Sequence, residues 1–203
     1  MDTNFLQNIN DTLATLFGGC DSLFVDGLAM SILPALSWLP FCLALFYIVV
    51  KNNETMSQIA IIGTCILLCV LFANVLPDAV VKENFSVRAS AAMSVAFFFS
   101  LLVRDALFSM ALVAWTLMRC WASVYIGECF PTDVFFGLLW GILVGGLSYL
   151  IYRKLYFLIT PRLNYISTHF TSTGYGYTDI HVILTVFAIT CCYIVVKAFT
   201  VAM

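Results

Sequence analysis

Residues 27–50 read GLAMSILPALSWLPFCLALFYIVV, which is 24 consecutive positions without a charged side chain. A helix rises about 1.5 Å per residue and the hydrocarbon core of a bilayer is about 30 Å thick, so about 20 mainly apolar residues make one crossing. This stretch therefore predicts a transmembrane helix. The next uncharged run, residues 55–77, covers 23 positions and predicts a second one.

Four more stretches have the same character, so the sequence predicts six spans. These are residues 89–103 with a start near 86, 106 to about 126, 134–152 and 180–203. Of the 203 residues, 63% are hydrophobic and 10% are charged, which excludes a soluble globular protein. A net charge of -2 without a basic patch argues against DNA or RNA as a partner. We therefore expect an all-α, polytopic membrane helix bundle.

The first 23 residues have a different pattern. Apolar side chains recur there at three- and four-residue steps among Asn, Gln, Asp and Thr; they are Phe5, Leu6, Ile9, Leu13, Leu16 and Phe17. This spacing predicts an amphipathic helix that lies in the membrane interface. The bundle is then expected to occupy residues 24–203.

Six spans place both ends of the sequence on one side of the membrane, which we call side A. Side A also receives residues 78–88 and 120–133, whereas the opposite side, side B, receives 51–54, 104–105 and 153–179. Side B has five of the nine Lys and Arg residues, and three of the five lie between positions 153 and 162. Because cytoplasmic loops carry an excess of these residues, we expect side A of this cell-membrane protein to face the periplasm or the extracellular space.

Small residues recur every four positions on two of the predicted spans. Gly137, Gly141 and Gly145 form one such row, and a second row follows on the third span at positions 92, 96 and 100. Small residues let the backbones of membrane helices approach closely. Both rows therefore predict packing faces.

The cysteines and histidines do not form a recognisable metal-binding pattern. Five of the eight cysteines lie inside predicted spans, where a cysteine is a small apolar residue. There is no Cys-x-x-Cys pair, and neither His169 nor His181 has a neighbour at the spacing of metal ligands. We therefore expect no metal and no cofactor.

Side A carries the one group of residues with a chemical pattern. Two short polar segments precede the third and fifth spans, and their notable residues are Lys82, Ser86, Arg88, Glu128, Cys129 and Asp133. In a bundle of six spans, both segments lie at the same depth, so their side chains can converge on one head group. Lysine, arginine and hydroxyl groups supply the charge-assisted hydrogen bonds that a phosphate accepts.

Residues 122–133, ASVYIGECFPTD, resemble the third signature of the type 2 phosphatidic acid phosphatases, Ser-Arg-x5-His-x3-Asp. This family is the membrane branch of the acid phosphatase and vanadium haloperoxidase superfamily. Residues 85–88, FSVR, resemble its second signature, Pro-Ser-Gly-His, and Lys82 resembles the first residue of Lys-x6-Arg-Pro. The resemblance extends over residues 24–152 and implies a phosphatase for lipid phosphates or polyprenyl pyrophosphates.

The resemblance also implies catalytic roles that these residues fill imperfectly. Cys129 stands at the position of the nucleophilic histidine, and Asp133 stands at the position of the residue that orients it. Arg88 replaces the histidine that protonates the leaving group, and a guanidinium cannot give up a proton at ordinary pH. Without its general acid, the site is expected to be catalytically defective.

The phosphate-binding set is altered as well. Lys82 and Ser86 match family positions, but Ser123 stands where the family has a phosphate-clamping arginine.

Three hypotheses for the function follow from the sequence. The first is a lipid phosphatase that uses Cys129, and the second is a catalytically silent protein that keeps the bundle and binds a lipid or serves a structural role. The third, with less support, is a small transporter. The expected partner is a membrane lipid, and the phosphatase hypothesis requires a phosphorylated or pyrophosphorylated head group.

Overall fold

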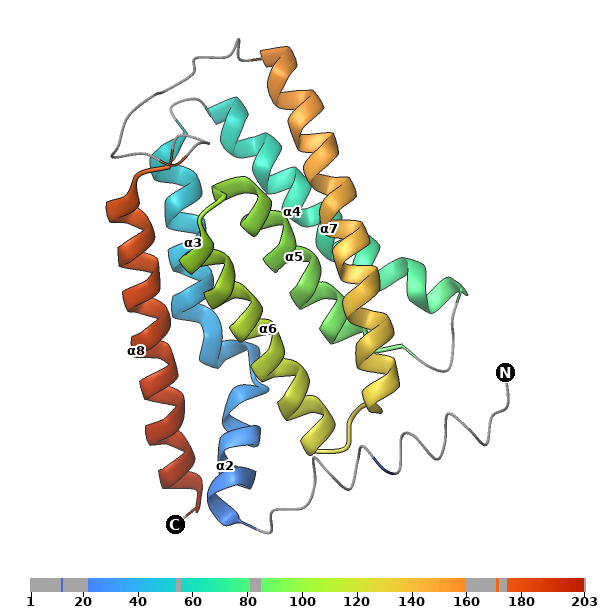
Figure 1. Ribbon diagram of the computed structural model, residues 1–203, viewed down its shortest axis with the longest axis vertical. Helices are drawn as coiled ribbons and strands as arrows, with labels where there is room; N and C mark the ends of the chain where they lie inside the picture. Colours follow the sequence, from blue (N-terminus) through green and yellow to red (C-terminus); the bar gives the residue numbers. More distant parts are fainter. Residues whose placement is uncertain are drawn as a thin grey trace.

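The computed structural model describes residues 12, 22–53, 56–80, 85–159, 171 and 175–202, and every element in these residues is a helix (Figure 1). The expected all-α membrane bundle is confirmed. The predicted interfacial helix falls almost entirely outside the described residues. The elements are α2 (Leu23–Ile32), the 3-10 helix η1 (Ala35–Trp38), α3 (Leu39–Asn52), α4 (Met56–Val80), α5 (Val87–Val103), α6 (Ala106–Tyr125), α7 (Pro131–Ile159) and α8 (Tyr177–Ala202).

Consecutive long helices run in opposite directions through the bundle. Within the described residues, five helical stretches are long and apolar enough to cross a membrane, and α5 is a shorter apolar helix of 17 residues. Figure 1 shows α3, α5 and α7 rising from one end while α4, α6 and α8 descend from the other. The starts of α2, α5 and α7 and the end of α8 thus share side A, as the sequence predicts.

The first predicted span is a broken helix, so the prediction of one continuous helix over residues 27–50 is wrong. The chain leaves the helical conformation at Pro34, whose ψ is 129°, and η1 and α3 follow it. Proline has no N–H to donate to a helix, and the extended ψ of Pro34 turns the chain away from α2, which explains the break. The indole N–H of Trp38 donates to the freed carbonyl of Ile32 at 2.7 Å, so this buried backbone group is satisfied.

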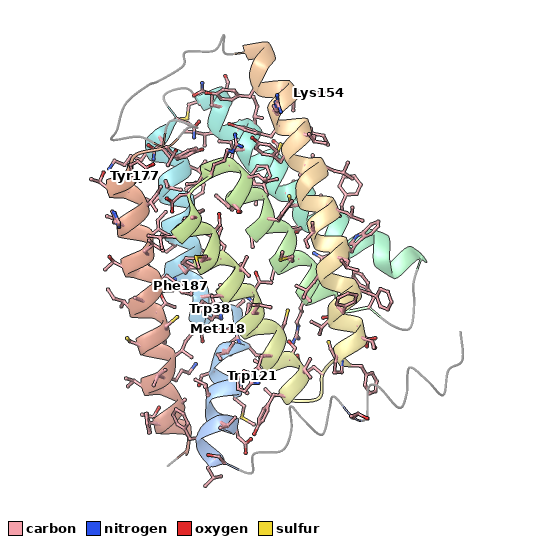
Figure 2. The ribbon with its side chains drawn as sticks, in the orientation of Figure 1. Trp38, Met118, Trp121, Lys154, Tyr177 and Phe187 are labelled. Atoms are coloured by element: carbon pink, nitrogen blue, oxygen red, sulfur yellow. The ribbon has the colours of Figure 1, made fainter. Side chains whose placement is uncertain are left out.

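An aromatic cluster surrounds this break and joins α3, α6 and α8. Trp38 lies beside Phe187 in Figure 2, with ring centroids 6.3 Å apart, and Phe41 and Trp115 complete the group. Trp38 and Phe41 are fully buried. Aromatic rings bury large apolar areas, so this cluster anchors the α3 side of the bundle.

Helix α7 continues beyond its predicted end. The sequence prediction ended this span at residue 152, before Arg153 and Lys154, but the helix extends to Ile159. Lysine and arginine are good helix formers, and their long side chains can reach the head groups from a helix end. Lys154 lies with Tyr177 at the end of the bundle opposite Trp121, in agreement with side B (Figure 2).

The close packing of α7 against α5 positions the residues of side A. A Cβ added to Gly137, Gly141 or Gly145 of α7 would lie 2.6–2.7 Å from a carbonyl oxygen of α5 or of its N-cap residue, so this predicted packing face is confirmed. The three carbonyls belong to Ser86, Ser90 and Ser94 in the same order, which shows that α5 and α7 run parallel. The first turns of both helices therefore lie side by side.

The second predicted row of small residues also lies in a packed region. Ala92 and Ala96 belong to the main core, and the hydroxyl of Ser100 donates to Ser109 of α6 at 2.6 Å. At side B, Lys51 at the end of α3 pairs with Asp179 in the first turn of α8 at 2.5 Å. These contacts fix α6 against α5 and α8 against α3.

Candidate functional site

The segment that follows α6 is shaped by a glycine turn. Gly127 has a φ of 81°, a left-handed conformation that strains any residue with a side chain. Its N–H donates to the Val124 carbonyl at 3.0 Å, and the Glu128 N–H donates to the Ser123 carbonyl at 3.0 Å. These two bonds form a Schellman motif, which ends α6 and directs the chain toward the start of α5.

Ser86 joins the two polar segments that the sequence predicts to converge. Its hydroxyl caps α5 by accepting from the Ala89 N–H at 3.4 Å, and its own N–H donates to the Asp133 carbonyl at 3.2 Å. The Cys129 thiol donates to the same hydroxyl, with Sγ and Oγ 3.4 Å apart. Because Ser86 is only 2% exposed, this junction is a fixed part of the bundle.

The Asp133 carboxylate stabilises the start of its own helix. It accepts from the Phe130 N–H at 3.4 Å and from the Thr132 hydroxyl at 3.4 Å, and it occupies the first turn of α7. An acidic side chain is favourable at this position because it satisfies free N–H groups and complements the helix dipole. The Cys129 thiol, which the family resemblance would pair with Asp133, donates to Ser86 instead.

Arg88 and Glu128 form an ion pair across the two segments. Their side chains are 58% and 36% exposed, so water competes for both charges. Exposed pairs of this kind contribute little to stability. The Arg88 guanidinium can therefore exchange Glu128 for another anion at small cost.

Next to this ion pair lies a small hollow with a volume of about 10 Å³, enough for one water molecule. It is lined by Arg88, Ala89, Arg119, Cys120 and Ser123. Ser123 is buried and lines the hollow from α6. The hollow is thus lined by two cationic residues, one hydroxyl-bearing residue and one thiol.

Arg119 is the member of this group that the sequence analysis missed. The sequence analysis left it inside the predicted span of residues 106 to about 126 without a role, although it lies in α6, four residues before Ser123. Residues four apart share one face of a helix, and this spacing was the available signal. The guanidinium lies 5.8 Å from the ring centroid of Trp115, one turn further into the membrane.

The structure thus brings together five of the six predicted site residues. Ser86, Arg88, Ser123, Cys129 and Asp133 surround the side A ends of α5, α6 and α7, whereas Lys82 falls outside the described residues. No group of three or more His, Cys, Asp or Glu side chains suited to a metal occurs within the described ranges. Chemically, the arrangement offers cations and hydroxyl groups to an anion.

The chemistry of Arg88 suits anion binding better than proton transfer. Its guanidinium holds its proton at ordinary pH, so it can bind an anion but cannot act as a general acid. The Cys129 thiol would have to lose its own proton before it could attack phosphorus. Binding requires neither step.

No protein-family model, curated protein or solved structure matches the chain.

Proposed function

We propose that this integral membrane protein binds a phosphorylated lipid head group at side A without hydrolysing it. In this proposal the bundle is that of a type 2 phosphatidic acid phosphatase whose catalytic residues have been replaced. The observation that carries it is the junction at Ser86, where the hydroxyl meets the Cys129 thiol at 3.4 Å and the N–H meets the Asp133 carbonyl. Two segments far apart in sequence thereby form one polar rim.

The chemistry of the rim supports an anionic ligand. Arg88 and Ser123 line one hollow, and Arg88 is the most exposed cation at its mouth. A phosphate accepts strong, charge-assisted hydrogen bonds from guanidinium groups and further bonds from hydroxyl groups. The ligand's acyl or prenyl chains would remain in the bilayer beside the helices, because the rim lies at the ends of membrane-spanning segments.

The loss of turnover follows from the replaced residues. Removing a nucleophile and a general acid together costs several kcal/mol of transition-state stabilisation. A Cys129-dependent phosphatase is the competing function, because the thiol lies within the same cluster. The two functions are distinguished by their products, because hydrolysis of phosphatidic acid releases inorganic phosphate and diacylglycerol, whereas binding releases neither.

The test measures phosphate release from detergent-solubilised protein given phosphatidic acid or undecaprenyl pyrophosphate. A companion variant carries Arg88→His, Ser123→Arg and Cys129→His, which restores the family's residues at three positions. We expect no release above background from the unmodified chain. Release at the rate of an intact family member, abolished by Cys129→Ser, would overturn the proposal in favour of the phosphatase.

A further inference from the structure

The two arginines of the hollow differ in their partners. Arg88 is paired with Glu128, whereas neither of the ion pairs formed among the described residues includes Arg119. Both guanidinium groups line the same hollow, and their positive charges repel each other across it. Two cations that repel in a small space are stabilised by an anion placed between them.

Arg119 also lies further inside its helix than Ser123 does. It precedes the end of α6 by six residues, which corresponds to about 9 Å along the helix. The side chain is half-buried, and its only described aromatic contact is with Trp115. A charged residue at such a depth is costly and most often serves a ligand or a partner charge.

We propose that Arg119 is a second phosphate-binding cation and that it draws the terminal phosphate of a lipid phosphomonoester below the rim. This inference rests on the proposed function and adds the residue that selects the ligand. A terminal phosphate carries up to two negative charges and exposes three oxygens, so two guanidinium groups can bind it from opposite sides. A phosphodiester has one negative charge and a substituent on either side of phosphorus.

The hollow as it stands holds about one water molecule, so phosphate entry requires a side chain to move. Arg88 is suited to this movement because its side chain is 58% exposed and, among the residues that the structure describes, is held by one exposed ion pair. Ser123 is buried in the wall and stays in place as a hydrogen-bonding group. Binding therefore replaces the contact between Arg88 and Glu128 by a contact with phosphate.

The experiment titrates the full-length protein in a mild detergent and follows its Tm by tryptophan fluorescence, because a ligand that binds the folded state raises Tm. The titrants are dioleoyl phosphatidic acid, dioleoyl phosphatidylcholine and inorganic phosphate. Arg119→Gln is expected to weaken phosphatidic acid binding about tenfold or more, the effect of one lost charge-assisted bond. Arg88→Gln should have a similar effect.

The matched control is Arg104→Gln, which removes the same charge from an exposed arginine at the side B end of α5. It should leave binding within about twofold. If Arg119→Gln behaves like this control while Arg88→Gln binds weakly, the second cation is wrong and the proposed function stands. If the unmodified chain does not bind phosphatidic acid, the proposed function itself fails.

Two further arms keep the inference testable. Arg119→Lys keeps the charge and should bind phosphatidic acid more tightly than Arg119→Gln, even if both variants have a lower Tm without lipid. Equal binding by these two variants would overturn a role for the charge. Inorganic phosphate should bind much more weakly than phosphatidic acid, and equal affinity would assign the hollow to free phosphate instead of a lipid.

Discussion

Arg88 contacts Glu128 at the mouth of the hollow, where the proposed ligand would also bind. The carboxylate and the phosphate therefore compete for one guanidinium. Replacing Glu128 by Gln removes the competing charge, so we expect phosphatidic acid to bind about two- to fivefold more tightly, the range of an exposed ion pair. The same Tm titration measures the change.

The control for this variant is Asp26→Asn. Asp26 is an exposed acid on α2, and it accepts a hydrogen bond from the Tyr125 hydroxyl at 2.7 Å without contacting Arg88. Asp26→Asn changes the net charge of the protein by the same amount as Glu128→Gln, so any general electrostatic effect on binding appears in both variants. Tighter binding by both variants to the same degree would show that Glu128 does not compete at Arg88.

Single residues of the site were predictable where they follow one another in short polar segments. Ser86, Arg88, Cys129 and Asp133 interrupt an apolar sequence, and the alternation of spans places them on one side. Arg119 was not predicted as a site residue because its role depends on which face of α6 points toward α5. Its four-residue spacing from Ser123 is a signal only once Ser123 itself is known to face α5.

At the level of elements, the parallel contact between α5 and α7 positions the site. A Cβ on Gly141 would lie 2.7 Å from both the Ser90 carbonyl and the Met93 Cβ, and backbone atoms cannot yield cheaply. Gly141→Ala should therefore reduce the free energy of unfolding by about 1–3 kcal/mol, as overpacking does elsewhere. Unfolding by SDS in mixed micelles measures this value.

Gly146 provides the matched control in the same helix. A Cβ there would meet only the Phe97 Cε1 atom at 3.6 Å, an ordinary contact. Gly146→Ala should leave stability unchanged or raise it by up to about 1 kcal/mol, because alanine favours helix. Equal destabilisation by both substitutions would contradict the assignment of the Gly137, Gly141 and Gly145 row as the close packing face.

The positions and packing faces of the helices were predictable where the local sequence pattern determines them. The four-residue spacing of glycine predicted the packing face because backbones can approach only where side chains are absent. The break at Pro34 was missed, since the prediction relied on an uncharged run and membrane helices often tolerate proline. The Trp38 indole N–H stabilises the break by donating a hydrogen bond to the Ile32 carbonyl, a contact that hydropathy does not encode.

For the whole molecule, the arrangement places the end of α8 on side A with the site (Figure 1). If side A faces outward, as the distribution of Lys and Arg predicts, a reporter fused after Met203 should also be outside. Alkaline phosphatase fused there should be active, and green fluorescent protein should be dark. A fluorescent fusion with an inactive phosphatase would place the site in the cytoplasm.

The central claim is that the side A rim of this bundle binds a phosphorylated lipid and leaves it intact. Native mass spectrometry of the full-length protein, incubated with equal amounts of phosphatidic acid and phosphatidylcholine, tests both parts together. We predict a one-to-one complex with the mass of intact phosphatidic acid, formed in preference to phosphatidylcholine. Equal retention of both lipids, or conversion of phosphatidic acid to diacylglycerol during the incubation, would contradict the claim.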